Sequence, residues 1–319
     1  MFDKLHSDLK ERISLSSQNC NVCGGELIIN YAKVQDAITK EYFAIYRCTK
    51  CGLGHTVPQP QNLTKFYGND YYNNRHGFTQ KHYTKRRIKI ICSAIKDRDG
   101  KRLLDIGCGD GSFLRAMKNL GWDVAGIEIN PKLELMEGII LKENIEELSD
   151  CEPFDCITMW HSLEHMQNIN LMLNQINSLL NPSGKLIIAV PNNNSFQSNI
   201  FKSKWFHLDV PRHLYHFDSS SLQYCLKANG FVVEQQCYQE LEYDLLGWTQ
   251  SALNNIFIKP NIFFDYVRKK RSEQGKLVNM LNLVIGSVFI MLSFPAVILE
   301  KLFNRSGTII IIARTDDLG

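Results

Sequence analysis

The stretch from residue 101 to residue 130, KRLLDIGCGDGSFLRAMKNLGWDVAGIEIN, constrains the fold more than any other part of the sequence. Its pattern predicts a strand, a glycine turn, a helix and a second strand. Residues 103–106 are mostly apolar, which is typical of a short strand buried on both faces. Residues 112–120 carry apolar side chains at helical spacing, and Gly121 suits the end of that helix. Residues 122–127 read as the second strand.

The glycine turn between these elements predicts a ligand site. Three glycines, Gly107, Gly109 and Gly111, let the chain turn sharply and let a ligand approach bare backbone. The second strand ends on an acid, Glu128. A glycine turn at a helix start, followed by an acid at the end of the next strand, suits a ribose-bearing ligand.

The spacing of the glycines distinguishes two kinds of ribose-bearing ligand. A dinucleotide turn follows G-x-G-x-x-G and would place its third glycine at Ser112. The sequence instead has D-x-G-x-G-x-G from Asp105 to Gly111. Together with the acid that ends the next strand, this pattern resembles motif I of the class I S-adenosylmethionine (SAM)-dependent methyltransferases. The resemblance extends over most of residues 100–240, and the chain resembles methyltransferase domains of types 11 and 23. The alternatives are a turn that serves only packing and an NAD-binding domain.

The resemblance implies a fold, a cofactor and a set of cofactor-binding residues. The fold is a three-layer α/β/α, Rossmann-like sheet whose last strand is antiparallel. In this family the glycine turn faces the amino-acid end of SAM, and an acid in the place of Glu128 takes the ribose hydroxyls. Asn144 stands where relatives carry a polar residue, usually aspartate, that contacts the adenine, and its amide can hydrogen-bond a base edge. The implied cofactor-binding residues are Asp105, Gly107, Cys108, Gly109, Gly111, Ser112, Phe113, Glu128, Ile129, Asn144, Ile145, Met159 and Trp160.

The predicted catalytic groups lie in residues 154–165, FDCITMWHSLEH. The first six of these residues read as the fourth strand, and ligands bind at the carboxyl ends of strands in open parallel sheets. The segment is similar to the matching part of small-molecule O- and C-methyltransferases, including ubiquinone-pathway and deoxysugar enzymes. By that resemblance, His165 or His161 is the general base for an acceptor hydroxyl, and Glu164 orients it.

The same residues admit two metal interpretations. They spell H-x-x-E-H, a zinc-peptidase pattern when it lies on a helix, but the surrounding methyltransferase framework excludes that interpretation. Some ubiquinone-pathway relatives hold a divalent ion here, and His161, Glu164 and His165 occupy the matching places, although a histidine replaces the first acid. The remaining alternative is that each histidine only caps or packs.

Two later segments also carry family resemblance. The run LLNPSGKLIIAVPN resembles the turn that precedes the fifth strand in these enzymes, so residues 181–184 are expected to end a helix ahead of a strand at 185–190. Residues 205–217, WFHLDVPRHLYHF, resemble an insertion that helps to build the acceptor pocket in sugar and quinone methyltransferases. There Arg212 is a candidate for binding a phosphate or carboxylate, and His213 is a third candidate base.

The insertion also has a purely structural interpretation, as a packing loop in which Asp209 and Arg212 pair. An aromatic loop at residues 66–72, ahead of motif I, is expected either to cover the cofactor or substrate or to pack on the domain surface. The basic stretch that follows, residues 81–96, predicts a helix with one apolar face and a solvated side of Lys and Arg residues.

Near the N-terminus, two C-x-x-C-G knuckles predict a zinc site formed by Cys20, Cys23, Cys48 and Cys51. Two such turns complete a tetrahedral zinc shell with no open position, which is structural rather than catalytic. The segment between the knuckles alternates like a β-hairpin. The alternatives are disulfides or a redox pair, and His55 is interpreted as a bystander.

Composition limits the partners and the compartment. The 319 residues allow one large domain or two, and 44% hydrophobic and 22% charged residues are ordinary for a globular protein. A net charge of +3 is too small to argue for a nucleic-acid partner, so none is expected. Residues 1–13 contain acids and have no apolar core, unlike a signal peptide. We therefore expect a cytoplasmic protein whose ten cysteines are reduced. The sequence indicates no particular oligomeric state.

Residues 277–299 contain no charged residue and are long enough to cross a bilayer. The cations that precede this segment are Lys269, Lys270, Arg271 and Lys276. Residues 308–314 read as the final strand of the sheet, inserted antiparallel between the fifth and sixth strands, and a single crossing would leave that strand on the wrong side. Pro295 also disfavours an uninterrupted helix. We expect a monotopic helix or shallow helical hairpin that contacts the inner leaflet, which makes the protein peripheral to the inner face of the membrane. The alternatives are a subunit interface and burial against the core.

These patterns predict five segments: a zinc ribbon (1–57), a linker and lid (58–98), a SAM-binding core (99–240), a hydrophobic helical insertion (241–307) and the final core strand (308–319). The favoured function is SAM-dependent methylation of a small or lipid-linked acceptor, with a sugar in surface-glycan or secondary-metabolite biosynthesis as the first choice. One alternative is a phenol O-methyltransferase of quinone type, which the membrane segment favours. The other is a non-catalytic scaffold that binds partners through the zinc ribbon.

Overall fold

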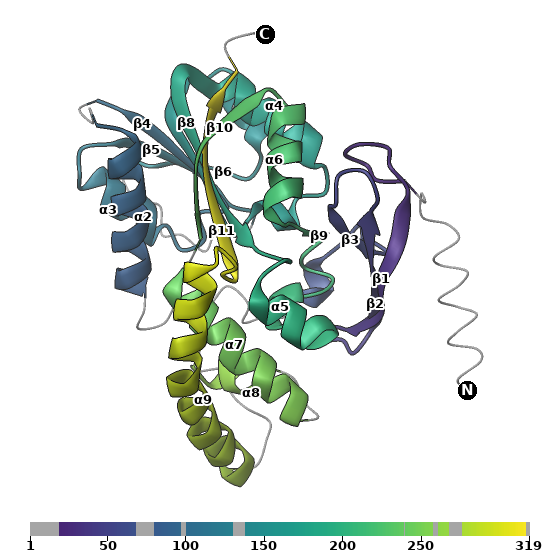
Figure 1. Ribbon diagram of the computed structural model, residues 1–319. Coiled ribbons are helices and arrows are strands. Elements are labelled where there is room, and N and C mark those ends of the chain that lie inside the picture. The colour runs from purple at the N-terminus through teal and green to yellow at the C-terminus, as the bar shows by residue number, and fades with distance from the viewer. Residues whose placement is uncertain are drawn as a thin grey trace. The chain divides into compact units, whose positions relative to one another are not determined.

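The chain folds into two units, each with its own sheet (Figure 1). The computed structural model describes residues 19–67, 80–96, 100–129, 138–238, 240–257, 261–267 and 276–316. Unit 1 comprises Met1–Tyr71, Pro191–Leu222 and Tyr243–Gly307, and unit 2 comprises Tyr72–Val190, Gln223–Glu242 and Thr308–Gly319. Most of the predicted aromatic loop (68–72) and the cations Lys269, Lys270 and Arg271 lie outside the described residues.

Unit 2 contains a seven-stranded sheet in the order β10-β11-β8-β7-β4-β5-β6. Its strands are β4 (Arg102–Ile106), β5 (Asp123–Ile127), β6 (Ile140–Lys142), β7 (Phe154–Trp160), β8 (Leu180–Pro191), β10 (Phe231–Tyr238) and β11 (Thr308–Thr315). The pairs β4–β5, β5–β6, β4–β7 and β7–β8 are parallel, whereas β10 pairs with β11 in the antiparallel sense. This arrangement confirms the predicted Rossmann-like sheet, including a final strand inserted between the fifth and sixth.

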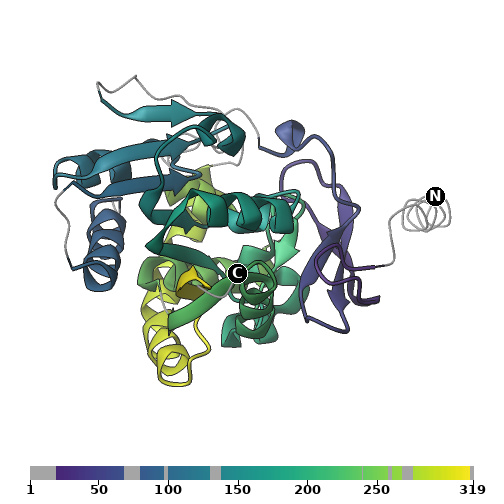
Figure 2. The same ribbon diagram turned by 90° about the horizontal axis from the view of Figure 1, so that it is seen from above.

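Helices cover both faces of this sheet, so side chains that point to either face are buried along its strands. On β4, neighbouring Leu103 and Leu104 point to opposite faces, and neither is exposed. Leu103 belongs to a cluster with Ile91 of α2 and Leu114 of α3. Figures 1 and 2 show α2 and α3 together on one side of the sheet and α4 on the other. The helices are α2 (Gln80–Ala94), α3 (Ser112–Lys118), α4 (Ile169–Leu179) and α6 (Ser219–Ala228), with short 3-10 helices η3 (Ile145–Leu148) and η4 (Leu163–His165).

The region before the fifth strand differs from its prediction in one respect. Residues 181–184 do end a helix, since α4 stops at Leu179, but the chain enters β8 at once instead of forming a separate turn. Leu180 pairs with Phe154, and the register of β7 and β8 then shifts before Cys156. The turn residues are therefore absorbed into an irregular start of β8.

Unit 1 contains a four-stranded sheet in the order β1-β2-β3-β9, in which every neighbouring pair is antiparallel. Its strands are β1 (Leu27–Gln35), β2 (Tyr42–Cys48), β3 (Gly54–Val57) and β9 (Tyr215–His216). Its helices are α5 (Phe196–Phe201), α7 (Leu241–Ile256), α8 (Ile262–Val267) and α9 (Lys276–Leu302), with 3-10 helices η1 (Thr64–Phe66), η5 (Lys202–Lys204) and η6 (Phe206–Leu208). Because β9 comes from residues 205–217, the cysteine-bearing hairpin and this insertion share one sheet.

The apolar segment near the C-terminus forms one continuous helix, α9, which includes Pro295. Of the two predicted forms, a single helix and a shallow hairpin, the structure has the single helix, and the predicted interruption at Pro295 is wrong. A proline inside a helix removes one N–H and crowds the carbonyl of residue i−4, here Met291, but Pro295 lies on an exposed part of the helix, and α9 continues past it to Leu302. Among the described residues, α9 is the helix whose length and composition suit a membrane span.

The core of unit 2 predicts a contrast between two leucines near α3. Leu114 is fully buried, whereas Leu120, just beyond the helix, is 52% exposed. Leu114→Ala should lower the free energy of unfolding by about 2–5 kcal/mol, because it removes buried methyl groups and leaves a cavity. Leu120→Ala should change it by no more than about 0.5 kcal/mol. Urea titrations measure both, and equal losses would contradict the packing described.

Candidate functional site

The carboxyl ends of three neighbouring parallel strands bring the predicted site residues of unit 2 to one edge. β4 lies between β7 and β5 in the sheet, and all three run in the same direction. The residues that follow these strands are Gly107, Glu128 and His161. This edge is where open parallel sheets bind their ligands.

The glycine turn has the backbone that its sequence predicts. Gly107, Gly109 and Gly111 have φ angles of 80°, 58° and 67°, in the left-handed region that favours glycine. A Cβ on Gly109 would meet no atom within 4 Å, so open space lies beside this residue. The Gly109 N–H donates to Glu128 Oε2 at 2.9 Å, which joins the turn to the acid at the end of β5.

Not every predicted cofactor-binding residue presents its side chain to that space. Asp105 is 2% exposed and accepts a hydrogen bond of 2.7 Å from the Thr158 hydroxyl. Burial raises the pKa of Asp105 to about 6, although Arg87 and the Thr158 hydrogen bond oppose the shift. The predicted residues whose side chains are buried are Asp105, Cys108, Phe113, Ile145, Met159 and Trp160. Ile129 and Asn144 are exposed, and Glu128 and Ser112 are half-buried.

Gln80, at the start of α2, was not predicted to take part in the glycine turn. Its side-chain amide donates to Ser112 Oγ at 2.8 Å and also contacts Asp110. Asp110 in turn accepts from the Ser112 N–H at 3.0 Å. The sequence offered no signal for this contact, because Gln80 lies about thirty residues before the turn.

His161 lies between two buried carboxylates. Its Nε2 is 2.6 Å from Glu240 Oε2, and its Nδ1 is 3.6 Å from Glu164 Oε1. His161 is 3% exposed, and both acids are fully buried. Glu240 was missed by the sequence analysis. The available signal was an acid just beyond the end of β10, 79 residues after its histidine.

Electrostatics favour the charged form of this pair. Burial opposes charge on His161, but Glu240 and Glu164 outweigh it and raise the pKa of the imidazole. Burial likewise opposes charge on Glu240, but His161 and the guanidinium groups of Arg87 and Arg86 lower the pKa of that carboxyl. Arg87, expected on the solvated side of its helix, in fact stacks over the Trp160 ring at 5.0 Å.

The three candidate bases differ in their surroundings. A buried His161 held between two carboxylates is suited to positioning the end of β7, and these carboxylates favour its protonated form over a free base. His165 is half-buried at the end of η4, in the same unit. His213 belongs to unit 1, where its Nδ1 is 2.9 Å from the His207 carbonyl oxygen. His165 is therefore the candidate base that unit 2 leaves most accessible.

In the insertion at residues 205–217, Arg212 links parts of unit 1. Arg212 is 3% exposed, and its guanidinium contacts Asp209 at 2.6 Å and Asp36 of the cysteine-bearing hairpin at 2.9 Å. It also donates to the Phe66 carbonyl oxygen at 2.7 Å. These partners match the structural interpretation of the loop, with Asp36 as an additional acid 176 residues away. A cavity of about 340 Å³ lies beside these groups within unit 1.

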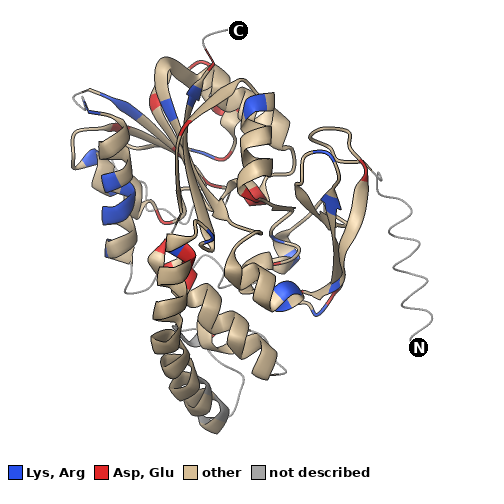
Figure 3. Cartoon of the chain, viewed as in Figure 1, with Lys and Arg blue, Asp and Glu red and all other residues tan. Residues whose placement is uncertain are grey.

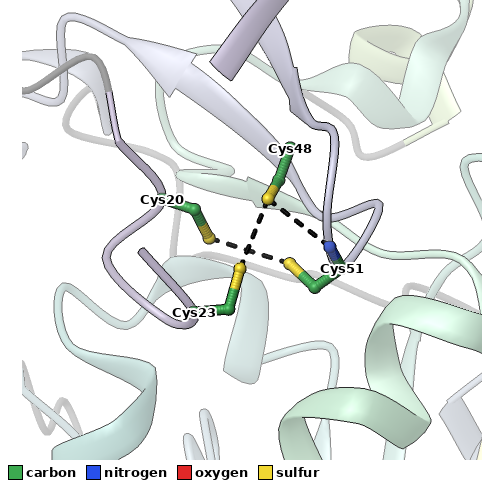
Figure 4. Close-up of side chains that lie close together, drawn as sticks. All are labelled: Cys20, Cys23, Cys48 and Cys51. Carbon is green, nitrogen blue, oxygen red and sulfur yellow. Dashed lines mark hydrogen bonds between the residues drawn. The ribbon is translucent and has the colours of Figure 1, made fainter. Parts of the chain in front are cut away.

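The four knuckle cysteines converge on one point in unit 1 (Figure 4). All four Sγ atoms lie within 4.8 Å of one another, with Cys20 to Cys51 at 3.7 Å and Cys23 to Cys48 at 3.4 Å. Zinc–sulfur bonds of about 2.3 Å in a tetrahedron separate the sulfurs by about 3.8 Å. None of these cysteines forms a disulfide. The donor set therefore fits a structural zinc ion.

The backbone around these cysteines supports the same site. The N–H groups of Lys50 and Cys51 point at Cys48 Sγ, at 3.4 and 3.5 Å, as donors to a thiolate. A Cβ on Gly25 would lie only 2.8 Å from Cys48 Sγ, so this glycine is needed for the approach. His55 is outside the set, and its ring packs edge-on against Tyr215 at 5.3 Å.

Comparisons with known proteins show similarity to methyltransferases. Residues 80–236 match the family model of a methyltransferase domain. A ubiquinone biosynthesis O-methyltransferase of Xanthomonas euvesicatoria pv. vesicatoria (strain 85-10) is 32% identical over 105 residues, which cover 29% of this chain and 44% of the relative. One from Rhodopseudomonas palustris (strain BisB5) is 28% identical over 167 residues, 47% of this chain and 66% of the relative.

The chain thus spans about half to two thirds of the length of these curated relatives. Among solved structures, the mycolic acid cyclopropane synthase CmaA1, complexed with SAH and CTAB, has a TM-score of 0.48 and 16% identity. That alignment covers 76% of this chain and 88% of the synthase.

The cysteine cluster predicts a bound metal. Protein purified without chelators should contain about one zinc per chain, because four thiolates close a tetrahedral shell. Cys48→Ser should lose the metal, whereas Cys237→Ser, which changes an exposed cysteine, should keep it. Inductively coupled plasma mass spectrometry measures both. Zinc-free wild-type protein, or full zinc in Cys48→Ser, would contradict the assignment.

The His161–Glu240 pair predicts a pH-dependent contribution to stability. Because the pKa of His161 is raised on folding, its contribution to stability is complete below pH 6.5, the pKa of an ordinary histidine. Because the pKa of Glu240 is lowered on folding, its contribution is complete above pH 4.5, the pKa of an ordinary glutamate. Glu240→Gln should therefore be most destabilising between these pH values, by up to about 3–5 kcal/mol. The difference should shrink as pH rises through the folded-state pKa of His161 or falls through that of Glu240.

Urea titrations of both proteins across this range measure the effect, and histidine NMR should show a lower His161 pKa in the variant. The isosteric Glu234→Gln, which changes a partly exposed acid paired with Lys185, is the control. A difference that does not vary with pH would contradict the ion pair.

Proposed function

Because residues 80–236 form a class I SAM-dependent methyltransferase domain, we propose that this chain methylates the phenolic oxygen of a quinone-type acceptor. The proposal depends on one observation at the carboxyl edge of the parallel strands. There the Gly109 N–H donates to the Glu128 carboxylate, and open space lies beside Gly109. Two properties support it there: bare backbone for close approach and an acid fixed at the end of the neighbouring strand.

The residues at this edge suit SAM. The open space beside Gly109 leaves room for the amino-acid end, and the Glu128 carboxylate can accept from ribose hydroxyls. Asn144 is exposed as the N-cap of η3, where its side chain accepts from the Glu147 N–H, so its amide NH2 group is the part that can donate to an adenine edge. The bound cofactor would supply an electrophilic methyl group on its sulfonium. The chain's own task is then to hold an acceptor oxygen in line with that methyl group, which accounts for much of the rate in such transfers.

Acid–base chemistry is assigned to His165. A phenol must lose its proton as its oxygen is methylated, and a half-buried imidazole at the end of η4 can accept it. The buried His161–Glu240 pair holds the strand end that leads into η4, so its role in this proposal is positioning. Glu164, which lies next to His165 in sequence, contacts His161.

The class of acceptor follows the curated relatives. Both relatives described above carry the name ubiquinone biosynthesis O-methyltransferase, and for this reason a phenol replaces the sugar that the sequence analysis preferred. The four-cysteine unit favours the sugar alternative, because a zinc ribbon is not expected in the quinone type. We propose that the zinc ion is structural in either case, since four thiolates leave no open position.

Titration with S-adenosylhomocysteine (SAH) tests the cofactor site. Gly109→Val should weaken binding by about tenfold or more, because the side chain enters the open space beside the turn. Gly100→Val is the matched control, since Gly100 also has a positive φ and no atom within 4 Å of a Cβ but lies before β4. Isothermal calorimetry measures both. No SAH binding by the wild type would favour the scaffold, and equal losses would show only backbone strain.

Acceptor profiling with methyl-labelled SAM tests the chemistry. Catechol-type phenols should be methylated in preference to nucleotide sugars. His165→Ala should lower kcat by about a hundredfold or more with SAH affinity unchanged, as loss of a general base does. His82→Ala, at an exposed histidine of α2, is the control. Preferential labelling of sugars would return the assignment to the first choice of the sequence analysis.

A further inference from the structure

Helix α9 has its polarity reversed relative to a helix of a water-soluble protein. Asn279, Gly286, Ser293 and Glu300 recur every seven residues along it. The last three are buried, and Asn279 is half-buried. The side of α9 that faces the rest of unit 1 carries these small and polar residues together with the fully buried Val297. An ordinary surface helix would instead place a mostly apolar side there.

The inward side is held by specific contacts. A Cβ on Gly286 would overlap the ring of Phe263, so the two helices α8 and α9 approach closely there. Ser293 Oγ lies 3.5 Å from Thr249 Oγ1 of α7. Glu300 accepts hydrogen bonds from the backbone N–H and the side-chain amide of Gln197, at 2.9 and 3.1 Å.

The outward side is apolar apart from Ser287, whose hydroxyl donates to the Leu283 carbonyl oxygen at 2.8 Å. Only 18% of the most hydrophobic window, within Asn279–Leu302, is buried. Between residues 277 and 299 the sequence has no charge, and Figure 3 draws most of α9 without charged residues. The exposed apolar residues are Leu277, Met280, Leu281, Val284, Val288, Met291, Leu292, Phe294, Ile298, Leu299 and Leu302. At 3.6 residues per turn they cover an arc of roughly 160°.

We propose that this outward face of α9 lies in the surface of a lipid bilayer, with the helix axis in the membrane plane. Reversed polarity is the pattern of helices that pack through small and polar residues and turn apolar side chains to lipid. The arc is wider than the narrow seam by which one helix pairs with another, which favours a continuous apolar solvent over a second copy of the chain.

The in-plane orientation follows from the neighbours of α9. Near its middle, α8 packs against Gly286, and at its end Glu300 is tied to Gln197 of α5. A helix that crossed the bilayer would carry these folded neighbours into the hydrocarbon. An interfacial helix needs only one apolar face and can keep its other face on the protein. This inference does not rest on methyl transfer, and its test reads no enzymatic activity.

Vesicle flotation of the full-length protein tests the proposal. The wild type should float with phosphatidylcholine vesicles, with and without phosphatidylglycerol, and should remain bound in 1 M salt because the contact is apolar. The double variant Val288→Glu/Met291→Glu should bind about tenfold less or weaker, since it places two carboxylates on the outward face. The matched control, Ile140→Glu/Leu171→Glu, changes two similarly exposed apolar residues of unit 2 and should bind as the wild type does.

Circular dichroism and zinc content show whether each variant is folded. Wild-type protein that does not float, binding that disappears in 1 M salt, or equal binding by Val288→Glu/Met291→Glu would overturn the proposal. A stable wild-type dimer that the same double substitution converts to monomers, with no flotation, would assign the face to a second copy instead. A fluorescent amino acid at position 291 that is quenched by nitroxide lipids would support the proposal directly.

Discussion

The parallel pairing of β4 with β5 and β7 is the constraint on which the site in unit 2 depends. It aligns Ile106 with Ile127 and Asp105 with Thr158, so the residues after each strand emerge at one edge. The N–H groups of Gly107 and Cys108 both donate to the Ile127 carbonyl oxygen, at 2.8 and 3.1 Å. The strand that ends in Glu128 thereby also holds the turn, and the two halves of the proposed cofactor site cannot move independently.

The same edge concentrates buried charge. Asp105 lies beneath the turn, and His161, Glu164 and Glu240 lie at the end of β7. Each isolated charge would be costly at such depth, and the pairing of an imidazolium with carboxylates offsets that cost. The ion pair therefore fixes the end of β7 more firmly than its backbone hydrogen bonds alone would do.

The parts of the fold predicted from the sequence are those with a local cause. A glycine at positive φ, a thiolate pair in C-x-x-C and a run of buried apolar residues each leave a mark within a few positions of the residues involved. Glu240 and Asp36 lacked such marks, because their partners lie 79 and 176 residues away in sequence. Arg212 was open to a ligand-binding interpretation for this reason, although the structure uses it to join two parts of unit 1.

For α9 the sequence contains a second pattern besides its high hydropathy. Length and the absence of charge indicated an apolar helix, but the seven-residue spacing of Asn279, Gly286, Ser293 and Glu300 already marked which side faces the protein. Pro295 was given too much weight, since contacts elsewhere along α9 hold the helix although this proline removes one N–H and crowds the preceding turn.

The position of β11 in the sheet has a consequence for how the chain is assembled. β11 lies between β8 and β10, yet it follows α9 in the chain. During vectorial synthesis on the ribosome, β8 and β10 must therefore wait with unpaired edges until the long apolar helix has been made. The most hydrophobic segment of the protein thus emerges while the sheet is still open, so apolar surface and an unpaired strand edge are exposed together during synthesis.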